Sequence, residues 1–269
     1  MLSNITTEVF KASLDNVSTS YLWLGSICYS LQLYYDFAGY SDMAIGISEM
    51  FGYGCIENFN YPYMTESVSK FWRRWHISLS EWFRDYIYIP LGGSRTTQKW
   101  RVYFNLFVVW LLTGIWHGAN WTFIVWGLDY FVLIAFERMT KLPDRISSTI
   151  GKLIYRVFTL MFVNFQWVLF NSVDINTGFR FIKHMLVYQS NDISSIRALF
   201  LMKDYLFFII IAVVLCFPIV PWMRKKVSDN KHKLMVFEIV EYSVIVVAFV
   251  LALSFVVAGQ NNPFAYANF

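Results

Sequence analysis

The chain has 269 residues, of which 57% are hydrophobic, 20% aromatic and only 15% charged, and its formal net charge is +4. Soluble domains average about 25% charged residues, so this composition argues against an ordinary soluble protein. The basic residues are scattered, which gives no sign of a nucleic-acid-binding patch.

Long apolar segments predict a multi-pass membrane protein. Runs of about 17–25 apolar residues can cross a bilayer, and roughly six or seven segments approach this length when flanking aromatic residues are included. They lie near residues 21–35, 43–53, 102–116, 121–136, 153–170, 206–220 and 236–257. Gly46 and Gly52 are expected to break the second segment. We predict an all-α polytopic membrane protein and a single membrane domain over residues 1–269.

Two acidic residues flank a predicted bend at residues 37–41. Asp36 and Asp42 both lie next to apolar sequence, where they would line a polar cavity or pair with basic residues of the following aromatic segment. Pairing is the favoured interpretation, and the candidate partners are Arg73, Arg74 and Arg84. The segment at residues 58–62 is predicted to be a structural turn, because Pro62 fixes its own backbone and restricts Tyr61.

The aromatic and charged segment at residues 66–89 predicts an amphipathic helix. On a helical wheel the aromatic arc and the charged arc separate, and such a helix lies in the membrane interface. The aromatic arc holds Phe71, Trp72, Trp75, Leu79, Trp82 and Tyr86, and the charged arc holds Lys70, Arg73, Arg74, Glu81, Arg84 and Asp85. His76 lies at the boundary, where spacing alone favours a tolerated position in an anchor over a functional one.

His117 is the strongest candidate for chemistry. It lies between two apolar segments and is followed by Gly118, which permits a break in the helix. An ionisable residue at membrane depth is costly and suggests function, although a histidine hydrogen-bonded between helices would fit equally well. Neutral imidazole can take a proton from a hydroxyl near neutral pH. With no Gly-x-Ser-x-Gly elbow or evident nucleophile, direct acyl transfer fits better than an acyl-enzyme.

No metal site is predicted, because the four histidines are far apart in the sequence. The three cysteines, Cys28, Cys55 and Cys216, have no close pair and resemble small apolar residues. Two basic loops, at residues 138–152 and 224–233, have two predicted spans between them. They are therefore expected to share one side of the membrane, and positive loops favour the cytoplasm.

Four motifs in order resemble the membrane-bound O-acyltransferase (MBOAT) family. They are QLYYDFAGYSDMAIG at 32–46, ENFNYPY at 57–63, FWRRWHISLS with WFRDY over 71–86, and WHG with NW over 116–121. The C-terminal NPF at 262–264 also resembles this family. YIPLGGSR at 88–95 is similar to the alginate and peptidoglycan O-acetyltransferase branch, whereas the branch that moves D-alanine onto teichoic acid tends to lack it.

The resemblance implies a ring of tilted helices around a tunnel, in the cytoplasmic (inner) membrane of a bacterium. It makes His117 and His76 the candidate catalytic residues, and Asp36, Asn120 and Arg73 candidate substrate-binding residues. It implies no bound cofactor. The acetyl donor, acetyl-CoA or an acyl carrier, would approach from the cytoplasm. The acetyl group would pass outward to a polysaccharide, commonly through a partner acetyltransferase.

Only the C-terminal part of the family pattern is covered, so we expect this chain to be the C-terminal portion of a longer protein, and activity of the chain alone is an open question. Other readings are D-alanyl transfer, a transporter, and a non-catalytic scaffold. Transporters often carry paired broken helices, and here the glycine-broken histidine turn has no clear counterpart. Retention of both histidines argues against a scaffold.

Overall fold

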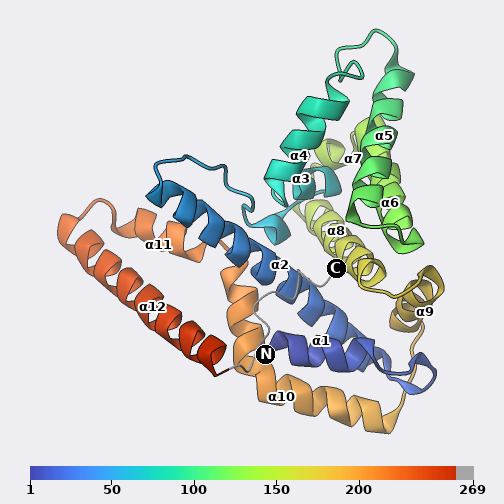
Figure 1. Cartoon of the computed structure of the whole chain (residues 1–269). Helices are drawn as coiled ribbons and strands as arrows, with labels where there is room; N and C mark the ends of the chain where they lie inside the picture. Colours follow the sequence, from blue (N-terminus) through green and yellow to red (C-terminus); the bar gives the residue numbers. More distant parts are fainter. Residues whose placement is uncertain (259–269) are drawn as a thin grey trace. The chain divides into compact units, whose positions relative to one another are not determined.

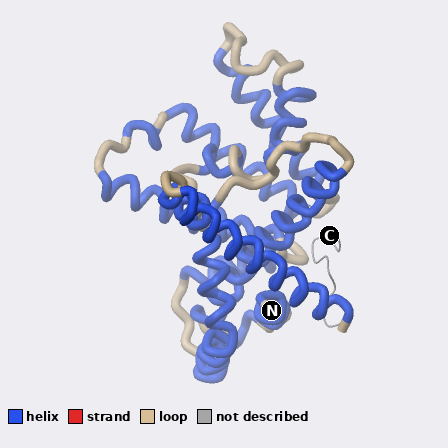
Figure 2. Tube along the Cα trace, turned by 90° about the vertical axis from the view of Figure 1, so that its left-hand side faces the viewer, coloured by secondary structure: helices blue, strands red, loops and turns tan. Residues whose placement is uncertain are grey.

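The computed structural model describes residues 1–258, and every regular element in that range is helical (Figure 2). The predicted motif at 262–264 lies outside the described residues. The chain divides into two compact units, Met1–Ala212 and Val213–Phe269. Each unit is described by itself, and the single membrane domain expected from the sequence stays a prediction.

The first unit is built from helices α1 to α9 and most of α10 (Figure 1). The α-helices are α1 (Leu2–Phe10), α2 (Thr19–Met50), α3 (Val68–Trp72), α4 (Ile77–Phe83), α5 (Lys99–His117), α6 (Trp121–Thr140), α7 (Leu142–Arg145), α8 (Thr149–Phe170), α9 (Ile175–Leu186) and α10 (Asp192–Leu215). Single turns η1 (Leu14–Asn16), η2 (Pro62–Met64) and η3 (Arg84–Tyr88, π-helical) complete it. The second unit contains α11 (Ile219–Val227) and α12 (Lys231–Val257).

Three of the described helices, α8, α10 and α12, are long and apolar enough to cross a membrane by length and composition. The predicted segments at 102–116, 121–136 and 153–170 correspond to α5, α6 and α8, and the last predicted segment lies within α12. The segment predicted at 206–220 is wrong in its bounds, since α10 begins at Asp192 and ends at Leu215. A full set of spans arranged around a tunnel stays a prediction.

The predicted break in the second apolar segment is wrong at Gly46, because α2 continues unbroken from Thr19 to Met50. The bend expected at residues 37–41 is also absent from this helix. A glycine inside a helix costs only about 0.5–1 kcal/mol relative to alanine, which a helix of 32 residues tolerates. The helix ends where expected from Gly52, whose φ of +80° stops it shortly after Met50.

The single amphipathic helix expected over residues 66–89 is wrong in its continuity. The segment forms α3, breaks at residues 73–76, resumes as α4 and ends in η3. His76 causes the break with a left-handed φ of +47°, which disfavours a continuing helix. The loop after α2 stabilises the break, since Ile77 donates its backbone N–H to the carbonyl of Asn58 at 3.0 Å.

The break also changes where the aromatic side chains go. Phe71, Trp72 and Trp75 are buried in the first unit, whereas Trp82 and Tyr86 are exposed. The first three aromatic rings therefore form core contacts between helices, and only the later part keeps the exposed aromatic face expected of an interfacial segment.

Close packing of α5 on α6 sets the position of the histidine turn (Figure 1). Gly114 of α5 and Gly127 of α6 lie at the crossing. A Cβ built on Gly127 would lie 2.5 Å from the backbone oxygen of Trp110, and one on Gly114 would lie 2.6 Å from that of Phe123. Both contacts are to backbone, so the helices could accept a side chain there only by moving apart.

We expect Gly127→Ala to lower the free energy of unfolding by about 1–3 kcal/mol, because it overpacks the α5–α6 contact. Thermal unfolding of the purified protein in detergent would measure this. Gly39→Ala is the matched control, since open space surrounds Gly39 in α2 and alanine is the better helix former. Equal melting temperatures for the two variants would contradict the assigned close contact.

Candidate active site

His117 is the last residue of α5, at the turn that leads into α6. The turn depends on Gly118, whose φ of +153° is strained for any other residue and whose Cβ position would lie 2.8 Å from the ring of Phe123. Asn120 then caps α6 by accepting from the N–H of Thr122. The local sequence therefore ends one helix and starts the next within three residues, leaving the imidazole at the junction.

Aromatic rings from three helices surround the His117 imidazole. Its ring centroid lies 4.8 Å from that of Trp116, 5.0 Å from Trp126 of α6 and 5.1 Å from Phe170 of α8. The three contacts are edge-to-face, a favourable arrangement for aromatic pairs. They hold the imidazole in an apolar setting, and His117 remains half-buried.

His76 lies at the break between α3 and α4, in the same part of the unit. Its imidazole packs edge-on against Phe37 of α2 at 4.7 Å and lies 6.2 Å from the ring of Trp116. The ring of Trp116 thus contacts both histidines. Removal from water lowers the pKa of His76 to about 4, so its imidazole is neutral at pH 7.

A cluster of large aromatic side chains packs against His117 through Trp126. Trp72 of α3 lies 4.9 Å from Trp110 of α5, 4.9 Å from Tyr130 of α6 and 5.6 Å from Trp126, by ring centroids. Trp126 also contacts His117. All four rings of this cluster are buried, so displacing α3 would disturb α5 and α6 together.

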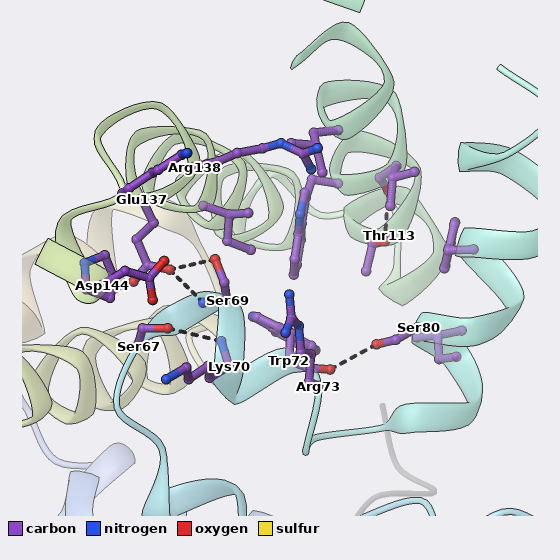
Figure 3. A pocket seen from close by; sticks show the side chains of 18 residues that line it. Ser67, Ser69, Lys70, Trp72, Arg73, Ser80, Thr113, Glu137, Arg138 and Asp144 are labelled. Atoms are coloured by element: carbon purple, nitrogen blue, oxygen red, sulfur yellow. Dashed lines mark hydrogen bonds between the residues drawn. The ribbon is translucent and has the colours of Figure 1, made fainter. Parts of the chain in front are cut away.

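A cavity of about 680 Å³ opens beside this cluster, between α3 and α4 on one side and α5 to α7 on the other (Figure 3). Trp72 and Trp110 form part of its lining. Four basic side chains line it as well, Lys70, Arg73, Arg138 and Lys141, against two acidic ones, Glu137 and Asp144. Arg73, expected from the sequence to bind substrate, is therefore exposed to a basic cavity adjoining the aromatic cluster.

Glu137 of α6 is a buried carboxylate that the sequence reasoning did not single out. It accepts from the backbone N–H of Val68 at 2.9 Å, from the N–H and hydroxyl of Ser69 at 2.8 and 2.6 Å, and from the hydroxyl of Tyr155 at 2.8 Å. It therefore connects the start of α3 to α6, as Figure 3 shows for Ser69, and through Tyr155 to α8. The available signal was an acidic residue closing an apolar segment, which suggests a specific role.

The acidic residues of α2 and their predicted basic partners were also candidate site residues. The favoured pairing of Asp36 or Asp42 with Arg73, Arg74 or Arg84 stays a prediction. Arg84 pairs with its neighbour Asp85 at 2.7 Å, which satisfies its charge locally. Asp36 is half-buried on α2, next to the Phe37 that packs on His76, and its substrate-binding role stays a prediction.

Asn120 uses both ends of its side chain within the fold. Its oxygen caps α6, and its amide donates to the carbonyl of Val173 at 2.8 Å. These bonds give it a structural role at the turn, and substrate binding stays a prediction. Within residues 1–258, no group of three or more His, Cys, Asp or Glu side chains is placed to hold a metal ion.

Comparison with known proteins gives a match to one protein family. The model of the MBOAT, membrane-bound O-acyltransferase family, matches residues 2–170. A protein of Azotobacter vinelandii named probable alginate O-acetylase AlgI is 48% identical over 168 residues, which cover 62% of this chain and 33% of that protein. A Helicobacter pylori peptidoglycan O-acetyltransferase is 42% identical over 165 residues, covering 61% and 31%.

A teichoic acid D-alanyltransferase of Bacillus subtilis is 37% identical over 158 residues, covering 54% of this chain and 39% of that protein. The chain spans about a third of the length of the curated relatives it matches. The matched family region ends at residue 170 and so includes both histidines, the aromatic cluster and the basic cavity.

Proposed function

Because the chain belongs to the membrane-bound O-acyltransferase family, we propose that it takes part in O-acetylating an extracytoplasmic polysaccharide of the alginate or peptidoglycan kind. The main support is that the imidazoles of His76 and His117, which come from separate segments, both lie beside the ring of Trp116. The relatives named as O-acetylases are 42–48% identical to the chain, against 37% for the B. subtilis D-alanyltransferase.

In this proposal His117 is the general base. Its imidazole takes the proton of an acceptor hydroxyl while the hydroxyl oxygen attacks the carbonyl carbon of an acetyl thioester. The carbon–sulfur bond breaks, the acetyl group forms an oxygen ester with the acceptor, and the thiolate leaves and is protonated. The rings of Trp126 and Phe170 cover part of the His117 imidazole, and excluding water from the exchange would favour transfer over hydrolysis.

The basic cavity suits the donor side of the reaction. Acetyl-CoA and acyl carriers both present phosphate groups, and Arg73, Arg138 and Lys141 offer cations around the cavity. Trp72 links this cavity to the aromatic cluster that contacts His117. We place donor entry here, with the cavity on the cytoplasmic side, because the loop after α6 is rich in basic residues.

The setting proposed is the bacterial cytoplasmic membrane, with the acetyl group delivered outward to the polysaccharide or to a partner acetyltransferase. D-alanyl transfer to teichoic acid is the second candidate, supported by the B. subtilis relative. The two differ in the group they leave on the polymer, which makes them separable by chemistry.

Deleting the gene in its native host and restoring it tests the proposal. Mild alkali releases ester-linked groups from purified surface polysaccharide, and acetate and D-alanine are then quantified separately. We expect ester-linked acetate to be lost on deletion and regained on restoration. Loss of D-alanine instead would support the second candidate, and unchanged levels of both would remove the acyltransfer proposal.

A further inference from the structure

Asn58, in the loop that follows α2, uses its side-chain amide to join three segments. Its oxygen accepts from the backbone N–H of Ser78 at 3.1 Å and from the Ser78 hydroxyl at 2.9 Å. Its amide nitrogen lies 3.0 Å from the hydroxyl of Ser41 on α2 and donates to it. The same oxygen lies 3.2 Å from Nδ1 of His76.

These bonds fix which way the amide points. A backbone N–H can only donate, so the atom that faces the N–H of Ser78 has to be the amide oxygen. Reversing the amide would place two donors against each other at this point and would lose this hydrogen bond. The atom that faces His76 is therefore an acceptor, and an acceptor bonds to Nδ1 only when Nδ1 carries the proton.

The backbone holds the two residues in register. Ile77 donates to the carbonyl of Asn58 at 3.0 Å, and Asn60 donates to the carbonyl of Arg74 at 2.9 Å. Bonds on both sides of His76 thus clamp the loop against the helix break, and the left-handed backbone of His76 directs its ring toward Asn58. The rings of Phe37 and Trp116 pack on the imidazole and offer no strong acceptor for the other tautomer.

We infer that Asn58 is a positioning residue that holds His76 as the Nδ1–H tautomer and leaves the lone pair of Nε2 free as an acceptor. The role of this acceptor in catalysis rests on the proposed function. Because His76 is neutral at pH 7, its ring carries one N–H proton, and the hydrogen bond to the Asn58 oxygen keeps that proton on Nδ1. His76 would then accept from an O–H or N–H of a substrate, such as the acceptor hydroxyl, and would not donate to the acyl carbonyl.

Nitrogen-15 NMR of the purified protein in lipid nanodiscs, labelled on histidine, reads the tautomer directly, and a His76→Ala sample assigns the signal. In the wild type we expect Nδ1 to be protonated and Nε2 to be unprotonated. In Asn58→Leu we expect the Nε2–H form to appear, because no acceptor then favours a proton on Nδ1. Asn58→Asp keeps the acceptor and adds a negative charge. In this variant we expect the pKa of His76 to rise, so that the doubly protonated imidazolium persists to higher pH.

Two variants control for disturbance of the loop. Ser78→Ala removes the hydroxyl and keeps the backbone donor, and Ser41→Ala removes the partner of the amide nitrogen, so both should retain the wild-type tautomer. An Nε2–H tautomer in the wild type, or no change of tautomer in Asn58→Leu, would overturn the inference. Equal membrane levels of all variants show that they fold.

Ester content of the polysaccharide separates this inference from the proposed function. We expect Asn58→Leu to lower acetate content at least about tenfold, as for loss of one acid–base partner, while Asn58→Asp retains more activity. If the tautomers behave as expected but His76→Ala leaves the ester content unchanged, the positioning by Asn58 stands and the catalytic use of His76 is wrong.

Discussion

Replacing His117 with alanine is expected to lower the rate of acetyl transfer by about 10²–10⁴-fold, the usual contribution of a general base. Ester-linked acetate on the surface polysaccharide should then fall to the level of a strain without the gene. The reason is local: the imidazole sits at the helix junction, held by Trp116, Trp126 and Phe170. The fold around it stays intact, since its ring makes packing contacts and no described hydrogen bond.

Two further variants sharpen this test. His117→Gln keeps a polar group of similar size but cannot take a proton near pH 7, so it should be as inactive as His117→Ala. His232→Ala is the matched control, because His232 is exposed in the second unit and should leave ester content at the wild-type level. Wild-type ester content in His117→Ala, with equal amounts of protein in the membrane, would exclude a general-base role.

The sequence predicts most of the long helices and singles out His117, for identifiable reasons. Apolar length alone indicates α5, α6, α8 and α12, because a helix of that length satisfies its own backbone hydrogen bonds. His117 stands out because Gly118 marks a break beside an ionisable residue. Each of these signals lies within a short stretch of sequence.

Interactions between distant segments account for the features that were not predicted. The break at His76 depends on backbone bonds from residues 58 and 60, and a helical wheel drawn for 66–89 alone cannot include them. In the sequence Asn58 looks like a simple turn residue. Only the structure shows that its side chain contacts Ser41, His76 and Ser78. The same holds for α2, which is continuous where a bend at residues 37–41 and a break at Gly46 were predicted.

Glu137 is the clearest case of a structural role hidden from the sequence. Its carboxylate is 4% exposed and accepts four hydrogen bonds from three donor residues, Val68, Ser69 and Tyr155. Buried polar groups are costly unless paired, and here two backbone donors at the first turn of α3 depend on one side chain of α6. The position of Trp72, and through it of the aromatic cluster, therefore depends on this carboxylate.

We expect Glu137→Ala to lower the free energy of unfolding by about 3–4 kcal/mol, because it leaves several buried donors unsatisfied at about 1–3 kcal/mol each without full additivity. For a unit of this size the melting temperature should fall by about 10 °C, measured by thermal unfolding in detergent. Tyr155→Phe, which removes one of the four donors, should cost only about 1 kcal/mol.

Glu66→Ala is the matched control for Glu137→Ala. Glu66 is exposed and forms surface ion pairs with Lys70 at 2.6 Å and Arg156 at 3.8 Å, and such pairs contribute about 0–1 kcal/mol. The same substitution should therefore have a small effect at position 66 and a large one at position 137. Similar melting temperatures for both variants would mean that the start of α3 is held by its packing against α6, and that the carboxylate is dispensable for positioning Trp72 and His76.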